Sequence, residues 1–258
     1  MGNQMKHPAG NFCWFELATS DRNAAIEFYA KLFNWDHDDV PLPGDMGVYS
    51  LLRLGDKQVA ALYQMGPQQA GGPPHWLPYV AVNSADEAAA KAVALSGEVL
   101  MPAFDVMDVG RMAVIKDPTG AVLAVWEPKR NLGVDLANAP GSACWGELAT
   151  RDTASAKAFY TGLFGWTTKE SDFMAYTEWL NGGQPIGGMM PMEGAQFEGV
   201  PPHWLTYFAV EDCDATAAQA QSMDGKLLVP PTDIPKTGRF SVIQDPQGAV
   251  FAVIHLTM

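Results

Sequence analysis

The chain contains nearly the same sequence twice. Residues 13–35 return as residues 144–166 at an offset of 131, and 13 of these 23 positions are identical. Residues 73–82 return as 201–210 at an offset of 128, and residues 110–125 return as 238–253. A repeat of this size predicts two halves that share one architecture. A residue that is kept in both copies is therefore a better candidate for a shared role than one that occurs once.

Composition narrows the class of protein. The 258 residues suffice for two halves of ordinary domain size, and 48% hydrophobic against 17% charged residues indicates a globular chain. The net charge of −13 argues against a nucleic-acid partner, because carboxylates repel phosphate groups. No apolar run approaches the ~20 residues that a membrane span needs. The three cysteines, Cys13, Cys144 and Cys213, form no disulfide or zinc pattern, so we expect a cytoplasmic protein.

The amino terminus carries no recognisable targeting signal. Residues 1–10 lack the apolar core of a signal peptide, and Lys6 stands where a myristoylation signal needs Ser or Thr. No membrane partner is therefore expected.

Each half predicts two βαβββ modules. Residues 12–18 alternate as a strand with Trp14, Glu16 and Ala18 on one face, and Asp21 can cap the helix that follows. After the connector at 66–74, the pattern repeats with a strand at 77–82 and a helix capped by Ser84. Further strands are expected at 47–53, 58–63, 98–101, 111–116 and 121–126. The polar segment 128–143 is the natural linker, so we predict domains at 1–128 and 144–258 with a linker at 129–143.

Two duplicated motifs carry a family resemblance. The first is a strand, an Asp and then F-Y-x-x-L-F-x-W, at 13–35 and 144–166; the second is D-P-x-G-A-x-x-A-V, at 117–125 and 245–253. With them the chain resembles the vicinal oxygen chelate superfamily of glyoxalases, bleomycin-resistance proteins and extradiol dioxygenases. The P-P-H-W motif is most similar to a two-domain branch described as glyoxalase-like or as a hydroxylase. The resemblance implies an α+β fold of tandem glyoxalase-like domains, each with two βαβββ modules that form a curled, cup-shaped sheet.

The resemblance also implies a metal site, which this sequence does not reproduce. The family's ligands, usually His, Gln or Glu, correspond here to apolar residues, and the remaining ligand position falls in 59–63 and 186–190, which offer no donor. Trp, Leu and Ala cannot supply the oxygen or imidazole ligands that divalent metals need. We therefore expect no metal, and a divalent metal only if ligands are relocated. The apolar residues are Trp14, Trp145, Leu77, Leu205, Ala124 and Ala252.

A Trp-x-Glu pair stands in place of the first ligand in both halves, at Trp14–Glu16 and Trp145–Glu147. In a functional interpretation, the indole stacks on a flat ligand while the carboxylate binds a donor on it or acts as a general base. In a structural interpretation, Trp fills a vacant cup and Glu pairs with a nearby Arg or Lys. The sequence leaves both interpretations open.

Other duplicated side chains have the same two interpretations. His75 and His203 are catalytic candidates, or they bond a backbone group after Pro-Pro. Arg111 and Arg239 could bind an anionic group, or they pair with Asp105 or Asp233 or with the D-P-x-G turn. Asp117 and Asp245 are expected to form turns. The aromatic candidates for ligand contact are Trp14, Trp76, Trp126, Trp145 and Trp204.

The sequence favours a glyoxalase-like protein without the usual metal ligands that binds a small, partly aromatic or apolar molecule in the sheet cup. One alternative is a metal-dependent lyase or dioxygenase-type enzyme that uses Glu16 with His75 and Glu147 with His203. The other is a scaffold protein whose cups are filled by its own side chains. We expect a small-molecule ligand and a monomer or homodimer.

Overall fold

The computed structural model describes residues 7–44, 47–69, 71–172 and 174–257. The start of the chain, on which the expectation about targeting signals rests, lies outside these residues. In the part of the chain that is described, no helix is both long and apolar enough to cross a bilayer.

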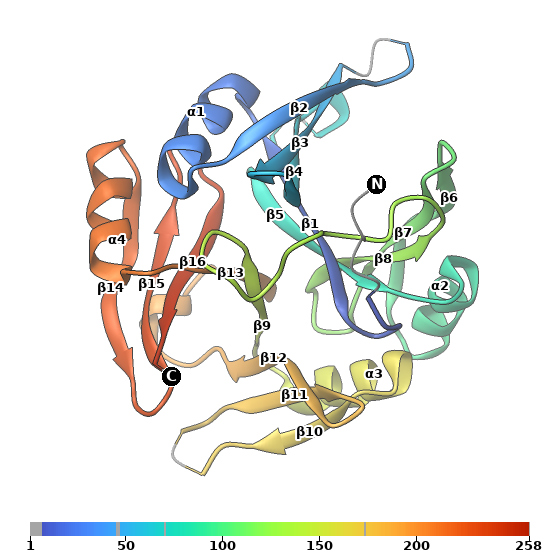
Figure 1. Cartoon of the computed structure of the whole chain (residues 1–258). Helices are drawn as coiled ribbons and strands as arrows, with labels where there is room; N and C mark the ends of the chain where they lie inside the picture. The colour runs from blue at the N-terminus through green and yellow to red at the C-terminus, as the bar shows by residue number, and fades with distance from the viewer. Residues whose placement is uncertain (1–6, 45–46, 70, 173, 258) are drawn as a thin grey trace. The chain divides into compact units, whose positions relative to one another are not determined.

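Four βαβββ modules follow one another along the chain, as the sequence predicts (Figure 1). The helices are α1 (Arg22–Phe33), α2 (Ala85–Ala94), α3 (Thr153–Phe164) and α4 (Cys213–Ser222). The strands of the first half are β1 (Phe12–Thr19), β2 (Asp36–Pro41), β3 (Val48–Leu54), β4 (Lys57–Gln64), β5 (His75–Ala81), β6 (Glu98–Val106), β7 (Gly110–Lys116) and β8 (Val122–Pro128). Those of the second half are β9 (Ala143–Thr150), β10 (Thr167–Glu170), β11 (Thr177–Asn181), β12 (Gln184–Pro191), β13 (His203–Ala209), β14 (Lys226–Ile234), β15 (Gly238–Gln244) and β16 (Val250–Leu256).

Each half contributes one open, mixed sheet of eight strands. The orders are β2-β3-β4-β1-β5-β8-β7-β6 and β10-β11-β12-β9-β13-β16-β15-β14. Within each module the first strand pairs parallel with the last, as β1 does with β4 and β5 with β8, and the other pairings within a module are antiparallel. The α+β class and the two βαβββ modules in each half are confirmed.

Local side-chain caps begin the helices where the sequence places them. The Asp21 carboxylate accepts a hydrogen bond from the backbone N–H of Ala24, and Asp152 accepts one from Ser155. Ser84 caps α2 in the same way through the N–H of Glu87. Each cap satisfies an N–H that has no partner inside its helix. The helix starts were therefore predictable from short-range chemistry alone.

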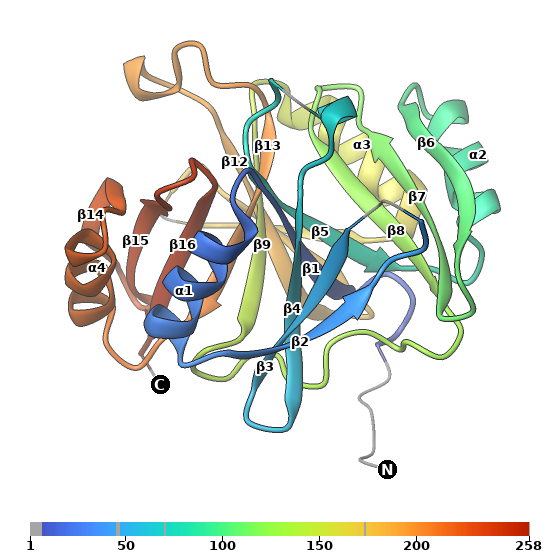
Figure 2. The same ribbon diagram turned by 90° about the horizontal axis from the view of Figure 1, so that it is seen from above.

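The compact units of the chain do not coincide with its halves. One unit contains residues up to Trp14, Pro78–Gly133 and Trp145–Leu205, and the other contains Phe15–Leu77, Val134–Cys144 and Thr206 onward. In the first unit α2 packs against α3, and in the second α1 packs against α4, as Figures 1 and 2 both show. A module of one half thus shares its helix-side core with a module of the other half.

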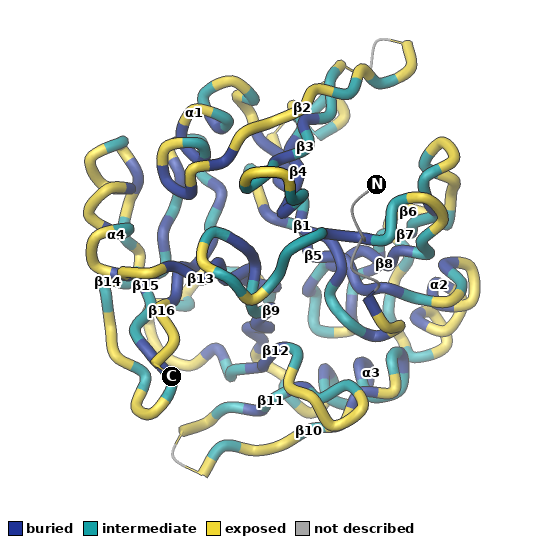
Figure 3. The backbone as a smooth tube through the Cα atoms, viewed as in Figure 1, coloured by how far each residue is buried: buried dark blue, intermediate teal, exposed yellow. Residues whose placement is uncertain are grey.

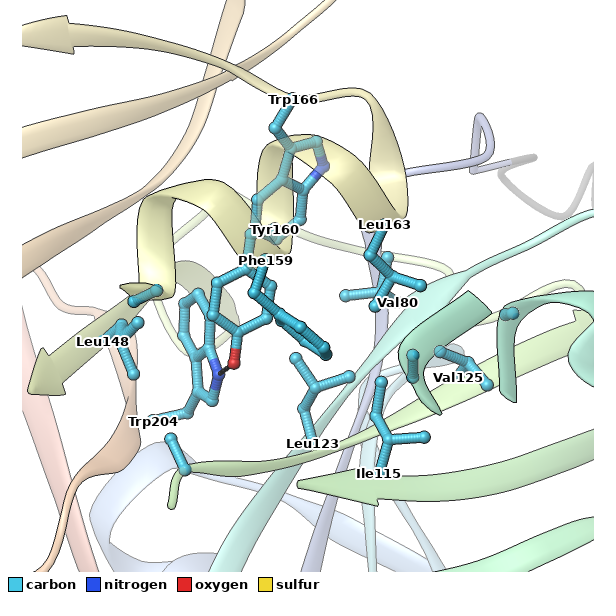
Figure 4. Packing of buried hydrophobic residues seen from close by; sticks show 14 of the residues in the cluster. Val80, Ile115, Leu123, Val125, Leu148, Phe159, Tyr160, Leu163, Trp166 and Trp204 are labelled. Carbon is cyan, nitrogen blue, oxygen red and sulfur yellow. Dashed lines mark hydrogen bonds between the residues drawn. The ribbon is translucent and has the colours of Figure 1, made fainter. Parts of the chain in front are cut away.

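The core of the first unit lies between its helices and its strands. The helices turn their buried residues inward and leave the opposite face exposed, as the colours of α2 show in Figure 3. Burying one large apolar side chain stabilises a fold by roughly 1.5–3 kcal/mol, so this layer is a major source of stability. Figure 4 shows its centre, where α3 lies over the strands; the labelled residues are Val80, Ile115, Leu123, Val125, Leu148, Phe159, Tyr160, Leu163, Trp166 and Trp204.

Candidate functional site

In the first unit, hydrogen bonds link three side chains: the indole of Trp145, the phenol of Tyr176 and the carboxylate of Glu147. The indole N–H of Trp145 donates to the Tyr176 hydroxyl at 2.8 Å, and that hydroxyl donates to Oε2 of Glu147 at 2.9 Å. Glu147 is buried, with 8% of its surface exposed. A hydrogen bond to a carboxylate is stronger than one between neutral groups, so this network fixes the carboxylate in place.

The second unit repeats the pairing of a carboxylate with a tyrosine. The Tyr49 hydroxyl donates to Oε2 of Glu16 at 2.6 Å. The ring of Tyr63, opposite Tyr49 on β4, stacks on it with centroids 6.5 Å apart. The glutamate of each Trp-x-Glu motif therefore accepts a hydrogen bond from a tyrosine hydroxyl.

Strand alternation places both glutamates on the sheet face away from the helices. Leu148 belongs to the helix-packed core of the first unit, so its neighbour Glu147 points the other way, and Trp145 lies on the same side as Glu147. In the second unit Leu17 is fully buried and Glu16 is partly exposed on the alternate face. Trp14, in the part of β1 that belongs to the first unit, is buried and 5% exposed.

The two tyrosines were missed in the sequence analysis. Tyr49 stands at the third strand of the first module, and Tyr176 just precedes the third strand of the third module. A signal was present, because Tyr49-Ser50 and Tyr176-Thr177 match at an offset of 127. The signal is short, and the loops on either side differ in length, so it carried little weight alone.

The histidines contact backbone groups and not the carboxylate networks. Nδ1 of His75 lies 3.0 Å from the carbonyl oxygen of Pro73, and Nδ1 of His203 lies 2.9 Å from that of Pro201. This is the geometry of the structural interpretation, in which each histidine fixes the entry of the chain into a strand.

The arginines pair with aspartates at helix starts and sheet edges. Arg111 binds Asp86 through Nε and Nη2, at 2.7 and 3.0 Å, and approaches Asp105 at 3.5 Å. Arg239 binds Asp214 in the same way and Asp233 at 2.9 Å. These contacts also match the structural interpretation.

Two tryptophans predicted to contact a ligand lie in the helix-side cores instead. Trp204 donates to the Tyr160 hydroxyl at 2.9 Å, and Tyr160 donates to Asp117 at 2.9 Å (Figure 4 shows the first of these bonds). In the second unit Trp76 donates to Tyr29, which donates to Asp245. The same aspartates accept three backbone N–H groups each in their turns, so their predicted role as turn formers is confirmed.

Trp126 lies on the face of β8 away from the helices, because its neighbour Val125 belongs to the helix-side core. Its indole covers Gly110 so closely that a Cβ on that glycine would come within 2.1 Å of the ring. Tyr79 contacts Trp126 edge-on, with ring centroids 6.5 Å apart. The second half has Ile254 at the position of Trp126, so this aromatic contact belongs to the first half.

The donor set at the implied metal positions does not fit a divalent metal. Ala124 and Ala252 occupy the position of the expected carboxylate ligand on the last strand, opposite Tyr79 and Tyr207 in the strand register, and alanine offers no metal ligand. Within the described residues, no group of three or more His, Cys, Asp or Glu side chains is arranged to hold a metal ion. The relocated pairs Glu16 with His75 and Glu147 with His203 do not form part of such a group.

A family model matches both halves of the chain. The model is that of the glyoxalase, bleomycin resistance protein and dioxygenase superfamily, and it matches residues 11–125 and 142–253. The chain belongs to this superfamily. The resemblance inferred from the two duplicated motifs is thereby confirmed.

Within this glyoxalase superfamily, the chain is similar over nearly its full length to proteins from Mycobacterium and Streptomyces. It is 43% identical to "Putative glyoxylase CFP32" of Mycobacterium tuberculosis, with 98% of each chain covered. It is 36% identical to "Anthracycline biosynthesis protein DnrV" of Streptomyces peucetius, with 94% of this chain and 92% of that one covered.

Solved structures show the same superfamily fold at low sequence identity. The 2,3-dioxygenase LapB of Pseudomonas sp. KL28 matches with a TM-score of 0.66 and 13% identity, over 97% of this chain and 94% of that one. The Mn(II)-bound glyoxalase of Novosphingobium aromaticivorans matches with a TM-score of 0.65 and 14% identity, over 96% and 82%. These likenesses support the fold, and not a particular reaction.

Buried and partly buried tyrosines predict that the protein loses stability at high pH. The pKa values of Tyr29, Tyr63, Tyr160 and Tyr176 are all raised, first by burial and second by a nearby carboxylate. Because the folded pKa exceeds the unfolded value of about 10, this stabilisation is complete below pH ~10 and is lost as the pH rises further. We expect part of the tyrosinate absorbance to appear only with loss of the circular dichroism signal. Reversible ionisation of all seven tyrosines in folded protein would contradict this.

Proposed function

We propose that this protein binds a small, partly aromatic molecule on the sheet faces that carry Glu16 and Glu147, without a metal. The observation that carries the proposal is the Tyr176–Glu147 hydrogen bond, which recurs as Tyr49–Glu16. A fixed carboxylate can accept a hydrogen bond from a ligand hydroxyl or amino group. Aromatic side chains beside it offer apolar contact to a flat ring.

The relatives supply a chemical class for the first probe. A protein 36% identical to this chain is named for anthracycline biosynthesis. An anthracycline has a flat fused-ring system with hydroxyl groups, which are the features that an aromatic surface and a carboxylate recognise. We therefore choose a purified anthracycline as the probe, and a fused aromatic hydrocarbon sulfonate without hydroxyl donors as its comparison.

Calorimetric titration of the probe tests the proposal. We expect Glu147→Gln and Tyr176→Phe each to weaken binding roughly tenfold to a hundredfold, because a hydrogen bond to a charged group contributes roughly 1.5–3 kcal/mol. Glu16→Gln reports separately on the first half. The matched control is Glu87→Gln, an exposed residue at the start of α2, which should leave binding unchanged.

Two outcomes would count against the proposal. Binding that is unaffected by all three site variants would place the ligand elsewhere. If neither compound binds and the melting temperature does not change, the proposal of ligand binding fails for this class.

Metal analysis separates this proposal from the metal-dependent alternative. Mass spectrometry on untagged protein purified without chelator should find less than one equivalent of iron, manganese, nickel or zinc. One or two equivalents, lost in Glu16→Gln or Glu147→Gln, would instead support an enzyme with relocated ligands.

A further inference from the structure

The connector between β4 and β5 is closed by the side chain of Gln69. Oε1 of Gln69 accepts from the N–H of Gly66 at 3.2 Å, and Nε2 donates to the Tyr63 hydroxyl at 2.8 Å. The backbone adds two bonds, from Gln69 N–H to the Gly66 carbonyl and from Gly72 N–H to the Gln69 carbonyl. One amide group therefore both shapes the turn and anchors it to β4.

The anchor, Tyr63, belongs to the carboxylate network of the same unit. Its ring stacks on Tyr49 at an interplanar angle of 22°, and Tyr49 donates to Glu16. Burial and then the negative charge of Glu16 raise the pKa of Tyr63. A path of direct contacts thus runs from Glu16 through two rings to Gln69.

The second half anchors its connector in another way. Met190 stands where the first half has Tyr63, and it offers no hydroxyl. Arg151 instead donates from Nη2 to the carbonyl oxygens of Phe197 and Val200, at 2.7 and 2.8 Å. None of these bonds passes through Tyr176 or Glu147. The two connectors therefore provide an internal comparison within one chain.

We infer that the first connector is coupled to the Glu16 network, so that a ligand bound there stabilises the turn at Gln69, whereas the second connector does not respond to its own site. Tyr63 and Gln69 act as positioning residues in this coupling. A ligand in contact with Tyr49 restricts the motion of its ring, and the stacked ring of Tyr63 is restricted in turn. The Tyr63 hydroxyl, which accepts the hydrogen bond from Nε2 of Gln69, then becomes fixed. The effect of a ligand on the turn rests on the proposed function, whereas the coupling between the Glu16 network and the connector does not.

Amide hydrogen exchange followed by NMR on the full chain tests the coupling without ligand. Tyr63→Phe keeps the ring and removes the acceptor, so the amides of Gln69 and Gly72 should exchange about fivefold faster, which corresponds to one hydrogen bond of ~1 kcal/mol. Glu16→Gln should accelerate the same amides in the same direction. The amide of Val200, which bonds the Phe197 carbonyl, is the internal control and should not change in either variant.

The same hydrogen-exchange experiment with the anthracycline probe added tests whether a bound ligand stabilises the turn at Gln69. Saturating probe should slow exchange at Gln69 and Gly72 in the natural chain, and this slowing should vanish in Gln69→Ala while calorimetry still detects binding. Unchanged exchange in both Tyr63→Phe and Glu16→Gln, or equal slowing at Val200, would overturn the coupling. If the probe does not bind, the proposed function fails for that class, while the ligand-free variants still decide whether the coupling exists.

Discussion

Asp245→Ala is expected to lower the free energy of unfolding by about 3–5 kcal/mol, one of the largest effects of any single substitution in this chain. The carboxylate is 3% exposed and accepts hydrogen bonds from three backbone N–H groups and from the Tyr29 hydroxyl. Its removal leaves the buried N–H of Ala249 and the buried hydroxyl of Tyr29 without this acceptor, and each such donor costs roughly 1–3 kcal/mol. Denaturant unfolding followed by circular dichroism measures the change.

The matched control is Asp233→Ala, which removes an exposed aspartate paired with Arg239. Exposed ion pairs contribute about 0–1 kcal/mol, so this variant should unfold close to the natural chain. Tyr29→Phe should fall between the two, because it removes one buried hydroxyl and keeps the ring. Equal destabilisation by Asp245→Ala and Asp233→Ala would contradict the role given to the turn carboxylate.

Gly188→Ala is expected to weaken probe binding in the second half by roughly tenfold to a hundredfold. Gly188 lies opposite Glu147 in the strand register, and a Cβ there would come within 1.9 Å of the Tyr176 hydroxyl oxygen. The methyl group must therefore displace the tyrosine from Glu147. The overpacking should also cost about 1–3 kcal/mol of stability.

A double-mutant cycle identifies the cause of this effect. In a Tyr176→Ala background the clash is gone, so Gly188→Ala should produce little further loss of probe binding. Calorimetric titration of the two single variants and the double variant gives the coupling energy. Additive losses would show that Gly188 acts on the site by some route other than Tyr176.

The duplicated motifs have a structural role that explains their retention. F-Y, P-P-H-W and D-P-x-G meet in a hydrogen-bonded chain of Trp, Tyr and Asp in each unit. Tyr29 of the first half bonds Asp245 of the second, and Tyr160 of the second half bonds Asp117 of the first. Their retention in both copies is therefore accounted for by the exchange of contacts between halves, and needs no catalytic role.

Features that depend on neighbouring residues, or on the repeat, were predictable from the amino-acid sequence. Asp21 and Ser84 begin helices because each side chain accepts a hydrogen bond from an N–H three residues further on. Asp117 forms a turn because its carboxylate accepts hydrogen bonds from N–H groups two to four residues further on. The four βαβββ modules followed from alternation, helical spacing and duplication. The family followed from motifs present in both halves.

Contacts between side chains far apart in the sequence depend on the three-dimensional arrangement of the strands and helices. Tyr29 and Asp245 are 216 positions apart, and Tyr49 and Glu16 lie on strands that a helix and another strand separate along the chain. Strand periodicity says which face a residue occupies, but not which residue on another strand lies beside it, since that depends on strand order and loop length. Trp76 and Trp204 illustrate the limit: as sequence they are aromatic candidates for a ligand, and packing against Tyr29 and Tyr160 places them in the cores.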